Sequence, residues 1–176
     1  DNFQLSQKLS FGQVLVKVIY SGICGSQLGE IQGIKGKDNF LPHLLGHEGS
    51  GIVMDVGEGV VDLKKNDHVV MHWKPNNKAE SANPRYYWKN KKLNAGKITT
   101  FNNLSIISQN RLTKIDNKFD LKTAALFGCA LSTGFGAVTN TANVKLGQSI
   151  IIIGCGGVGI SSILAASLAG CNPIIA

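Results

Sequence analysis

Four side chains in this sequence are of types that bind soft or borderline metal ions. They are Cys24 in GICGS, His47 and Glu48 in GHEGSGIV, and Cys129 in FGCALSTGFG. Thiolates and imidazoles are typical zinc ligands, and a catalytic zinc keeps one coordination position open beside three protein ligands. Cys24, His47 and Cys129 could supply those three ligands only in a fold that brings them together, because they lie far apart in the sequence.

A glycine-rich turn follows a run of four isoleucines near the end of the sequence. The run spans residues 150–153, and the glycines after it have the spacing G-x-G-x-x-G. After a buried strand, this spacing is typical of a turn that holds a dinucleotide pyrophosphate at the N-terminus of the next helix. The candidate cofactor-binding residues of the turn are Gly154, Gly156, Gly157, Val158 and Gly159. A metal and a nicotinamide dinucleotide together would indicate hydride transfer.

The elements that must position these residues fall into two groups. Residues 14–20, 51–56 and 67–72 are rich in β-branched residues and predict short strands at irregular spacing, as in a β-barrel-like domain. Helices are predicted over residues 119–127 and 132–142. The isoleucine run then predicts a buried parallel strand, and residues 161–169 predict the helix after the turn.

The stretch from Leu146 to Ala176 has no charged residue, which is compatible with a membrane span by composition alone. The glycine cluster and Pro173 argue against a span, and the centre of a doubly wound sheet has the same lack of charge. The first ten residues are polar and do not resemble a signal peptide, so we expect a cytoplasmic protein. The four cysteines are not dense enough to predict disulfides, and we expect Cys155 and Cys171 to be inert.

Residues 73–97, called the basic lobe below, carry most of the net charge. Seven bases and a single acid, Glu80, give this segment +6 of the chain's +7. Four aromatic residues lie among the bases, a composition found on surfaces that bind nucleic acids or anionic ligands. The interpretation that we favour is a solvated, mobile excursion between two strands.

The motifs together resemble the zinc-dependent medium-chain dehydrogenase/reductase superfamily, the group of alcohol and polyol dehydrogenases. VLVKVIYSGICGS, LPHLLGHEGSGIVMDVGEGV, DHVVMHW, LSTGFGAV and GCGGVG occur in the family's order, over residues 13–176. The resemblance implies a GroES-like, β-barrel-type catalytic domain over residues 1–120. An incomplete Rossmann-type dinucleotide-binding domain would follow over residues 121–176, with a first strand, glycine turn, helix and start of a second strand.

The resemblance also implies an activity and roles for site residues. The full-length protein would transfer hydride between an alcohol or polyol, or the matching carbonyl, and NAD or NADP. Cys24, His47 and Cys129 would hold one catalytic zinc, and Glu48 would act near that metal or take a coordination position. Ser26 matches a hydroxyl that bonds the substrate alcohol and starts a proton path, and Thr133 matches a residue that packs by the nicotinamide.

Three departures from the family's pattern concern the metals and the proton path. Gln27 stands where the family commonly has an aspartate that orients the zinc-bound histidine. Gly29 stands where a relay histidine is common, and we do not assign that role to the nearby His43. Residues 67–102 contain no cysteine, which excludes the family's structural zinc.

The residue that distinguishes NAD from NADP would lie beyond Ala176, so we expect this sequence to be a piece that is inactive alone. Two alternatives stay open: a zinc-free enone or quinone reductase of the same superfamily, and a non-catalytic relative that binds a partner through the basic lobe. For the full-length protein we expect a small-molecule alcohol or carbonyl substrate and a homo-oligomer. A membrane or nucleic-acid partner is not expected.

Overall fold

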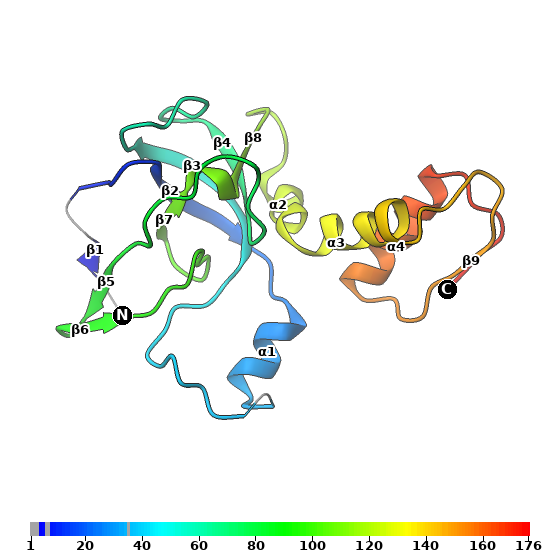
Figure 1. The fold of residues 1–176 in the computed structure, drawn as a ribbon, viewed down its shortest axis with the longest axis horizontal. Helices are drawn as coiled ribbons and strands as arrows, with labels where there is room; N and C mark the ends of the chain where they lie inside the picture. The colour runs from blue at the N-terminus through cyan, green and yellow to red at the C-terminus, as the bar shows by residue number, and fades with distance from the viewer. Residues whose placement is uncertain (1–3, 6–7, 35) are drawn as a thin grey trace. The chain divides into compact units, whose positions relative to one another are not determined.

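The computed structural model describes residues 4–5, 8–34 and 36–176, which group into two compact units, Asp1–Gly128 and Cys129–Ala176 (Figure 1). Residues 1–3 and 6–7 lie outside the described residues. They belong to the N-terminal segment that does not resemble a signal peptide. Each unit is described by itself.

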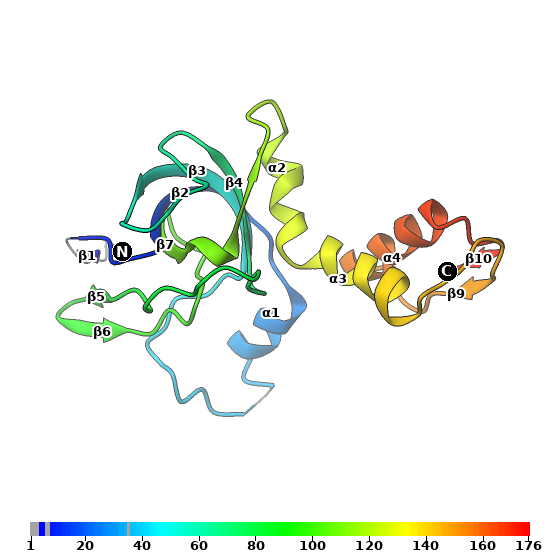
Figure 2. The ribbon, with the colours of Figure 1, turned by 45° about the horizontal axis from the view of Figure 1, so that its top comes forward.

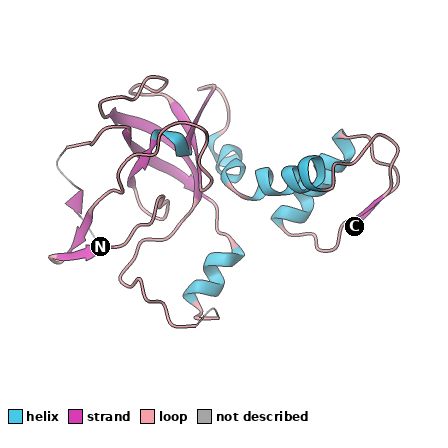
Figure 3. Cartoon of the chain, viewed as in Figure 1, coloured by secondary structure: helices cyan, strands magenta, loops and turns pink. Residues whose placement is uncertain are grey.

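The first unit is built on a five-stranded antiparallel sheet of order β7-β2-β3-β4-β8. Figure 3 draws its strands in magenta. Its strands are β2 (Gln13–Ser21), β3 (Glu48–Val56), β4 (His68–His72), β7 (Leu104–Ser108) and β8 (Leu112–Ile115). Alternate residues of these strands, among them Val14, Val16 and Val53, form one hydrophobic core. The three strands predicted from β-branched runs are confirmed as β2, β3 and β4.

The sheet curls, but no strand pairing closes it among the described residues. Its two edge strands, β7 and β8, are joined by a single 3₁₀ turn, Gln109–Arg111. Ser108 and Leu112 are four residue steps apart and so at most about 14 Å from each other, which brings the two edges near each other at this end, and Figure 2 shows the curl. The GroES-like, β-barrel-type fold is therefore present as a curled, open sheet rather than as a closed barrel.

The basic lobe contains a hairpin of β5 (Tyr86–Trp88) and β6 (Lys91–Leu93), to which β1 (Gln4–Leu5) adds a third strand. Tyr86 is fully buried and forms a small core with Leu93 and Ala95. Packing of an aromatic residue thus orders the lobe. The expectation of a fully solvated excursion is wrong for these three residues, although the lysines of the lobe are exposed, and the expected mobility stays a prediction.

Three helical segments complete the first unit. Helix α1 (Gly25–Ile31) follows β2, and α2 (Leu121–Ala124) continues into a 3₁₀ segment, η2 (Ala125–Gly128). The Asp120 carboxylate accepts hydrogen bonds from the N–H groups of Lys122 and Thr123 and so caps α2. The helix predicted over residues 119–127 is confirmed as this pair of segments.

The second unit contains one β-α-β arrangement preceded by a helix. Helix α3 (Ala130–Gly136) continues into a π-helical segment, η3 (Ala137–Thr141). Strands β9 (Ile150–Ile151) and β10 (Ile174–Ile175) are parallel, and α4 (Gly157–Leu168) connects them. Val138, Ala165 and Ala166 form the core between the helices. The parallel strand, the turn and the helices predicted for this region are confirmed. The prediction that the strand is buried is wrong, because β9 keeps only Ile150–Ile151 and has β10 as its single partner among the described residues, so Ile151 is 67% and Ile153 is 97% exposed.

No single helix in the described part of the chain is long and apolar enough to cross a membrane. One bent pair, Leu121–Gly128 with Ala130–Thr141, passes such a test on length and composition only.

Candidate metal centre and glycine turn

The ligand atoms of Cys24, His47 and Cys129 all lie within 4.8 Å of one another. Each of the three side chains is partly buried. Three residues separated by 23 and 82 positions in the sequence therefore form one sulfur, nitrogen, sulfur donor set. Such a set fits zinc by the chemistry of its donors.

Cys24 is positioned by the start of helix α1. It is the N-cap residue, and its carbonyl oxygen accepts hydrogen bonds from the N–H groups of Gln27 (3.0 Å) and Leu28 (3.2 Å). The hydroxyl of Ser26 donates to the Cys24 sulfur at 3.2 Å. Ser26 therefore lies beside the candidate ligand, with its side chain also exposed to solvent.

His47 and Glu48 are positioned by Gly46, which directly precedes them at the start of strand β3. Gly46 has φ +96°, and a Cβ there would lie 2.6 Å from the backbone nitrogens of Thr100 and Phe101, so only glycine fits. The Glu48 carbonyl then accepts hydrogen bonds from the Gly22 N–H (3.2 Å) and the Thr100 hydroxyl (3.1 Å). These two hydrogen bonds hold the backbone at Glu48, next to His47, in place.

Cys129 is positioned by the close packing of the residue before it. A Cβ on Gly128 would overlap the carbonyl oxygen of Met71 and lie 2.9 Å from the Glu48 Cβ. Gly128 thus packs directly on strands β3 and β4, and Cys129 follows it in the chain.

Burial controls the charge state of His47. Desolvation lowers the pKa of its imidazole, and the charge of Glu30 opposes this effect. A lowered pKa favours the neutral ring, which is the form that binds a metal. The Glu48 side chain is 3% exposed, and its carboxyl packs so closely on Gly22 that a Cβ there would lie 2.5 Å from Oε1.

Gln27, the departure from the family's aspartate, is 7% exposed on the inner side of α1. Its Oε1 has no hydrogen-bond partner among the described residues. Gly29 lies on the same helix, and the nearby His43 is paired with Asp38 at 2.8 Å.

A second group of metal-ligating types, Glu30, Asp38 and His43, also has its ligand atoms within 4.8 Å of one another. No motif indicates it, because two of its members lie in the irregular segment after α1. Sequence reasoning therefore missed it.

The glycine turn of the second unit lies between β9 and α4. Gly154 has φ +101°, and Gly156 is the N-cap of α4. A Cβ on Gly159 would overlap the carbonyl oxygen of Gly154, so the helix can approach the end of the strand only with glycine there. Gly157 and Val158 form the first turn of α4. Thr133 lies on α3 with its side chain exposed.

This fold is that of the alcohol dehydrogenase GroES-like domain. The family model for the alcohol dehydrogenase GroES-like domain matches residues 10–117, and the chain belongs to that family.

Curated relatives carry dehydrogenase names. A probable S-(hydroxymethyl)glutathione dehydrogenase of Schizosaccharomyces pombe is 30% identical over 93% of this chain and 50% of its own length. An alcohol dehydrogenase class-3 of Caenorhabditis elegans is 32% identical over 93% of this chain and 49% of its own length. The chain thus spans about half of the length of the curated relatives that it matches.

Solved structures agree on the fold. Benzyl alcohol dehydrogenase from Acinetobacter calcoaceticus superposes with a TM-score of 0.83 at 26% identity, over 98% of this chain and 52% of that one. A quinone oxidoreductase from Pseudomonas syringae pv. tomato gives 0.72 at 21% identity, over 96% of this chain and 45% of that one, which shows the fold alone.

Proposed function

We propose that the full-length protein transfers hydride between an alcohol or polyol, or the matching carbonyl, and NAD or NADP, with one catalytic zinc. The observation that carries the proposal is the donor set of Cys24, His47 and Cys129, whose ligand atoms lie within 4.8 Å of one another. The family of the chain and the dehydrogenase names of its relatives support the reaction class.

Zinc fits the donor set in type and in spacing. Zinc–ligand bonds are about 2.0 to 2.3 Å long, so ligands that share one ion lie roughly 3 to 4 Å apart, which side-chain rotations within this group can reach. When bound, zinc polarises the substrate oxygen and the nicotinamide exchanges the hydride. Two thiolates, a neutral imidazole and one open position would be the protein's contribution. The Glu48 carboxylate is not in this group of ligand atoms and packs on Gly22, so its role near the metal stays a prediction.

Ser26 is our candidate for holding and moving the substrate proton. Its hydroxyl is both a donor and an acceptor, which a proton path requires. It lies 3.2 Å from the Cys24 sulfur and is exposed, so a proton received at Oγ could pass to water. Because Ser26 is itself exposed, a proton could reach solvent from it without passing through a second side chain. A relay histidine is therefore not required, and this chain has Gly29 at that position.

The glycine turn is our candidate for the pyrophosphate of NAD or NADP. Gly154, Gly156 and Gly159 open helix α4, whose first N–H groups and positive dipole attract phosphates. Thr133 is proposed to pack by the nicotinamide. The cytoplasmic location and the homo-oligomeric state expected from the sequence stay predictions.

The test is an assay of the purified full-length protein for NAD⁺ or NADP⁺ reduction with a panel of primary alcohols and polyols. Treatment with 1,10-phenanthroline should abolish the reduction, and added zinc should restore it. A zinc-free reductase would instead reduce enones or quinones after the same treatment. A zinc-loaded protein that binds no nicotinamide cofactor would contradict the proposal and favour a non-catalytic relative.

A further inference from the structure

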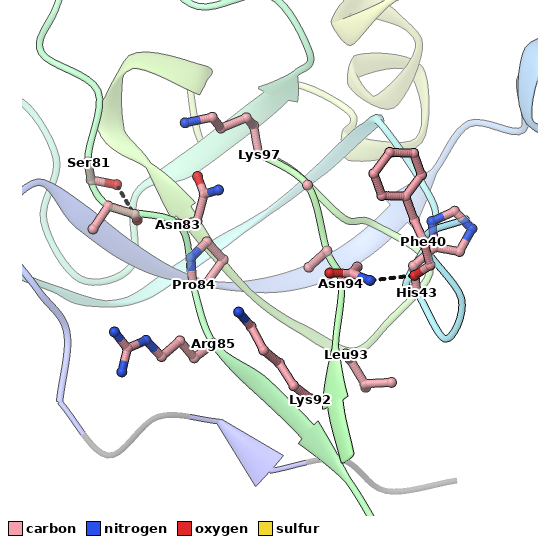
Figure 4. A pocket seen from close by; sticks show the side chains of 13 residues that line it. Phe40, His43, Ser81, Asn83, Pro84, Arg85, Lys92, Leu93, Asn94 and Lys97 are labelled. Atoms are coloured by element: carbon pink, nitrogen blue, oxygen red, sulfur yellow. Dashed lines mark hydrogen bonds between the residues drawn. The ribbon is translucent and has the colours of Figure 1, made fainter. Parts of the chain in front are cut away.

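A cavity of about 780 Å³ lies in the first unit, between residues 81–85 and residues 92–97. Small-molecule sites in proteins have volumes of about 300 to 1,000 Å³. Figure 4 shows the side chains that line it, including Phe40, Asn83, Arg85, Lys92, Asn94 and Lys97. Cys24, His47 and Cys129 are not among them, whereas His43 of the second group is.

Two of the cations project from the same face of the β5–β6 hairpin. Tyr86 pairs with Leu93 and Tyr87 with Lys92, and both Tyr86 and Leu93 are buried. Because successive side chains of a strand alternate between faces, Lys92 belongs to the opposite, outer face. Arg85 directly precedes β5 and shares that face with Tyr87, diagonally across from Lys92.

No acid among the described residues neutralises this pair. Neither Arg85 nor Lys92 forms an ion pair with the part of the chain that the structure describes. Like charges on neighbouring strands repel each other, which destabilises the hairpin. An anion bound between Arg85 and Lys92 would attract both side chains and offset their mutual repulsion.

Lys97 supplies a third cation at the other end of the cavity (Figure 4). It lies 3.4 Å from Glu80, but Glu80 is shared with Arg111, whose Nη2 is 2.5 Å from the Glu80 carboxylate. Glu80 thus pairs with both Lys97 and Arg111 and cannot neutralise both, so the cavity keeps a net positive charge.

We propose that this cavity binds a small molecule that carries two phosphate-type groups. Arg85 and Lys92 would hold one group and Lys97 the other, with the Asn83 amide as a neutral donor and Phe40 as an apolar wall. Arg85, Lys92 and Lys97 all line the hollow, whereas Lys89 and Lys91 at the hairpin tip do not. This arrangement favours a compact ligand over a nucleic-acid strand. The proposal goes beyond hydride transfer and does not depend on it.

Pyrophosphate is a suitable probe, because it has two linked anionic groups. Calorimetric titration of the full-length protein with pyrophosphate at low ionic strength should show saturable binding. Removing each charge-assisted contact should weaken binding roughly tenfold, so the double variant Arg85→Gln with Lys92→Gln should lose about a hundredfold. The matched double variant Lys89→Gln with Lys91→Gln removes the same charge outside the cavity and should change affinity by less than about threefold.

All four side chains are exposed, so neither double variant should unfold the protein. The Arg85 and Lys92 variant loses their mutual repulsion and should melt at the same or a slightly higher temperature, whereas the control loses the contact of Lys89 with the Trp88 ring. Absence of pyrophosphate binding to the unmodified protein would overturn the proposal. So would an equal loss in the two double variants, which would indicate diffuse attraction. Tighter binding of a single-stranded oligonucleotide, weakened equally in both variants, would identify a nucleic-acid surface instead. The readout is binding without turnover, so its failure leaves the dehydrogenase proposal untouched.

Discussion

At the scale of single residues, Ser26 is the side chain whose chemistry is most sharply testable. Its hydroxyl donates to the Cys24 sulfur, yet removing one such bond should leave the three candidate ligands in place. Replacing it by alanine should lower the turnover number with alcohols by roughly 10² to 10⁴ fold, the usual contribution of a general acid–base group. Zinc content should stay unchanged. Ser167→Ala, on an exposed position of α4, is the control. Unaltered turnover at saturating substrate would assign Ser26 a structural part only.

His72 makes a prediction about pH. Its Nδ1 lies 2.6 Å from the Lys74 carbonyl oxygen, and its Nε2 lies 3.1 Å from the Thr113 hydroxyl, an arrangement that suits a neutral ring. Burial is the main cause that lowers the pKa of His72 below the ordinary 6.5, with Arg111 adding to it and the Lys74 carbonyl opposing it. The unfolded chain therefore binds a proton more readily than the folded protein below about pH 6.5.

The sign of the effect follows from this linkage. Stability should fall as the pH drops below 6.5 and should level off only below the lowered pKa of the folded state. In His72→Gln this contribution is absent, whereas that of His47 is retained, so the melting temperature should depend less on pH. Melting curves between pH 5 and 7.5 measure the difference. A variant with the same pH dependence as the unmodified protein would exclude His72 as a cause.

At the scale of elements, the basic lobe depends on Tyr86. Its hydroxyl accepts a hydrogen bond from the Ile106 N–H at 2.8 Å, and the side chain is 0% exposed. Tyr86→Phe leaves a buried N–H without this partner, which should cost about 1 to 3 kcal/mol of the free energy of unfolding. Tyr87→Phe, at the next position and 39% exposed, should cost less than about 0.5 kcal/mol. Equal losses in chemical denaturation would contradict the anchoring role.

Helix α4 can approach the end of β9 only because Gly159 has no side chain. Gly159→Ala would force its methyl group into the Gly154 carbonyl oxygen, so the turn or the helix must shift. We expect a loss of about 1 to 3 kcal/mol and a smaller rise of the melting temperature with NAD⁺ or NADP⁺. At Gly157 the new methyl group would meet the Ala130 Cβ at an ordinary 3.4 Å, so Gly157→Ala should leave folding stability nearly unchanged. Similar stabilities of the two variants would argue against this packing constraint.

The elements that could be predicted from the sequence are those with a strong local pattern. β-Branched runs indicate β2 to β4, and isoleucines before a glycine turn indicate β9 and α4. The β5–β6 hairpin was not predicted, because Lys89 and Asn90 take the positive φ values of 47° and 61° that usually require glycine. Helix α1 was missed because two of its seven residues are glycines, which disfavour helices.

At the scale of the whole molecule, the candidate metal site could not be derived from spacing. Cys24, His47 and Cys129 stand on three different elements, and only the resemblance to a family grouped them. Gly46 and Gly128 position two of the three, but a glycine in a sequence does not tell what it packs against. The sequence predicted an excess of positive charge in the basic lobe but not the cavity. Arg85 and Lys92 share one face of the hairpin only in the register that the structure shows, and that register could not be read from the sequence.

Zinc content is the most direct test of this account. Elemental analysis of the purified full-length protein should give about one zinc ion per chain. Cys24→Ser and Cys129→Ser should each lose most of it, whereas Cys155→Ser, an exposed thiol in the glycine turn, should keep it. A protein without zinc when purified in its presence would contradict the account, as would equal zinc content in all three cysteine variants.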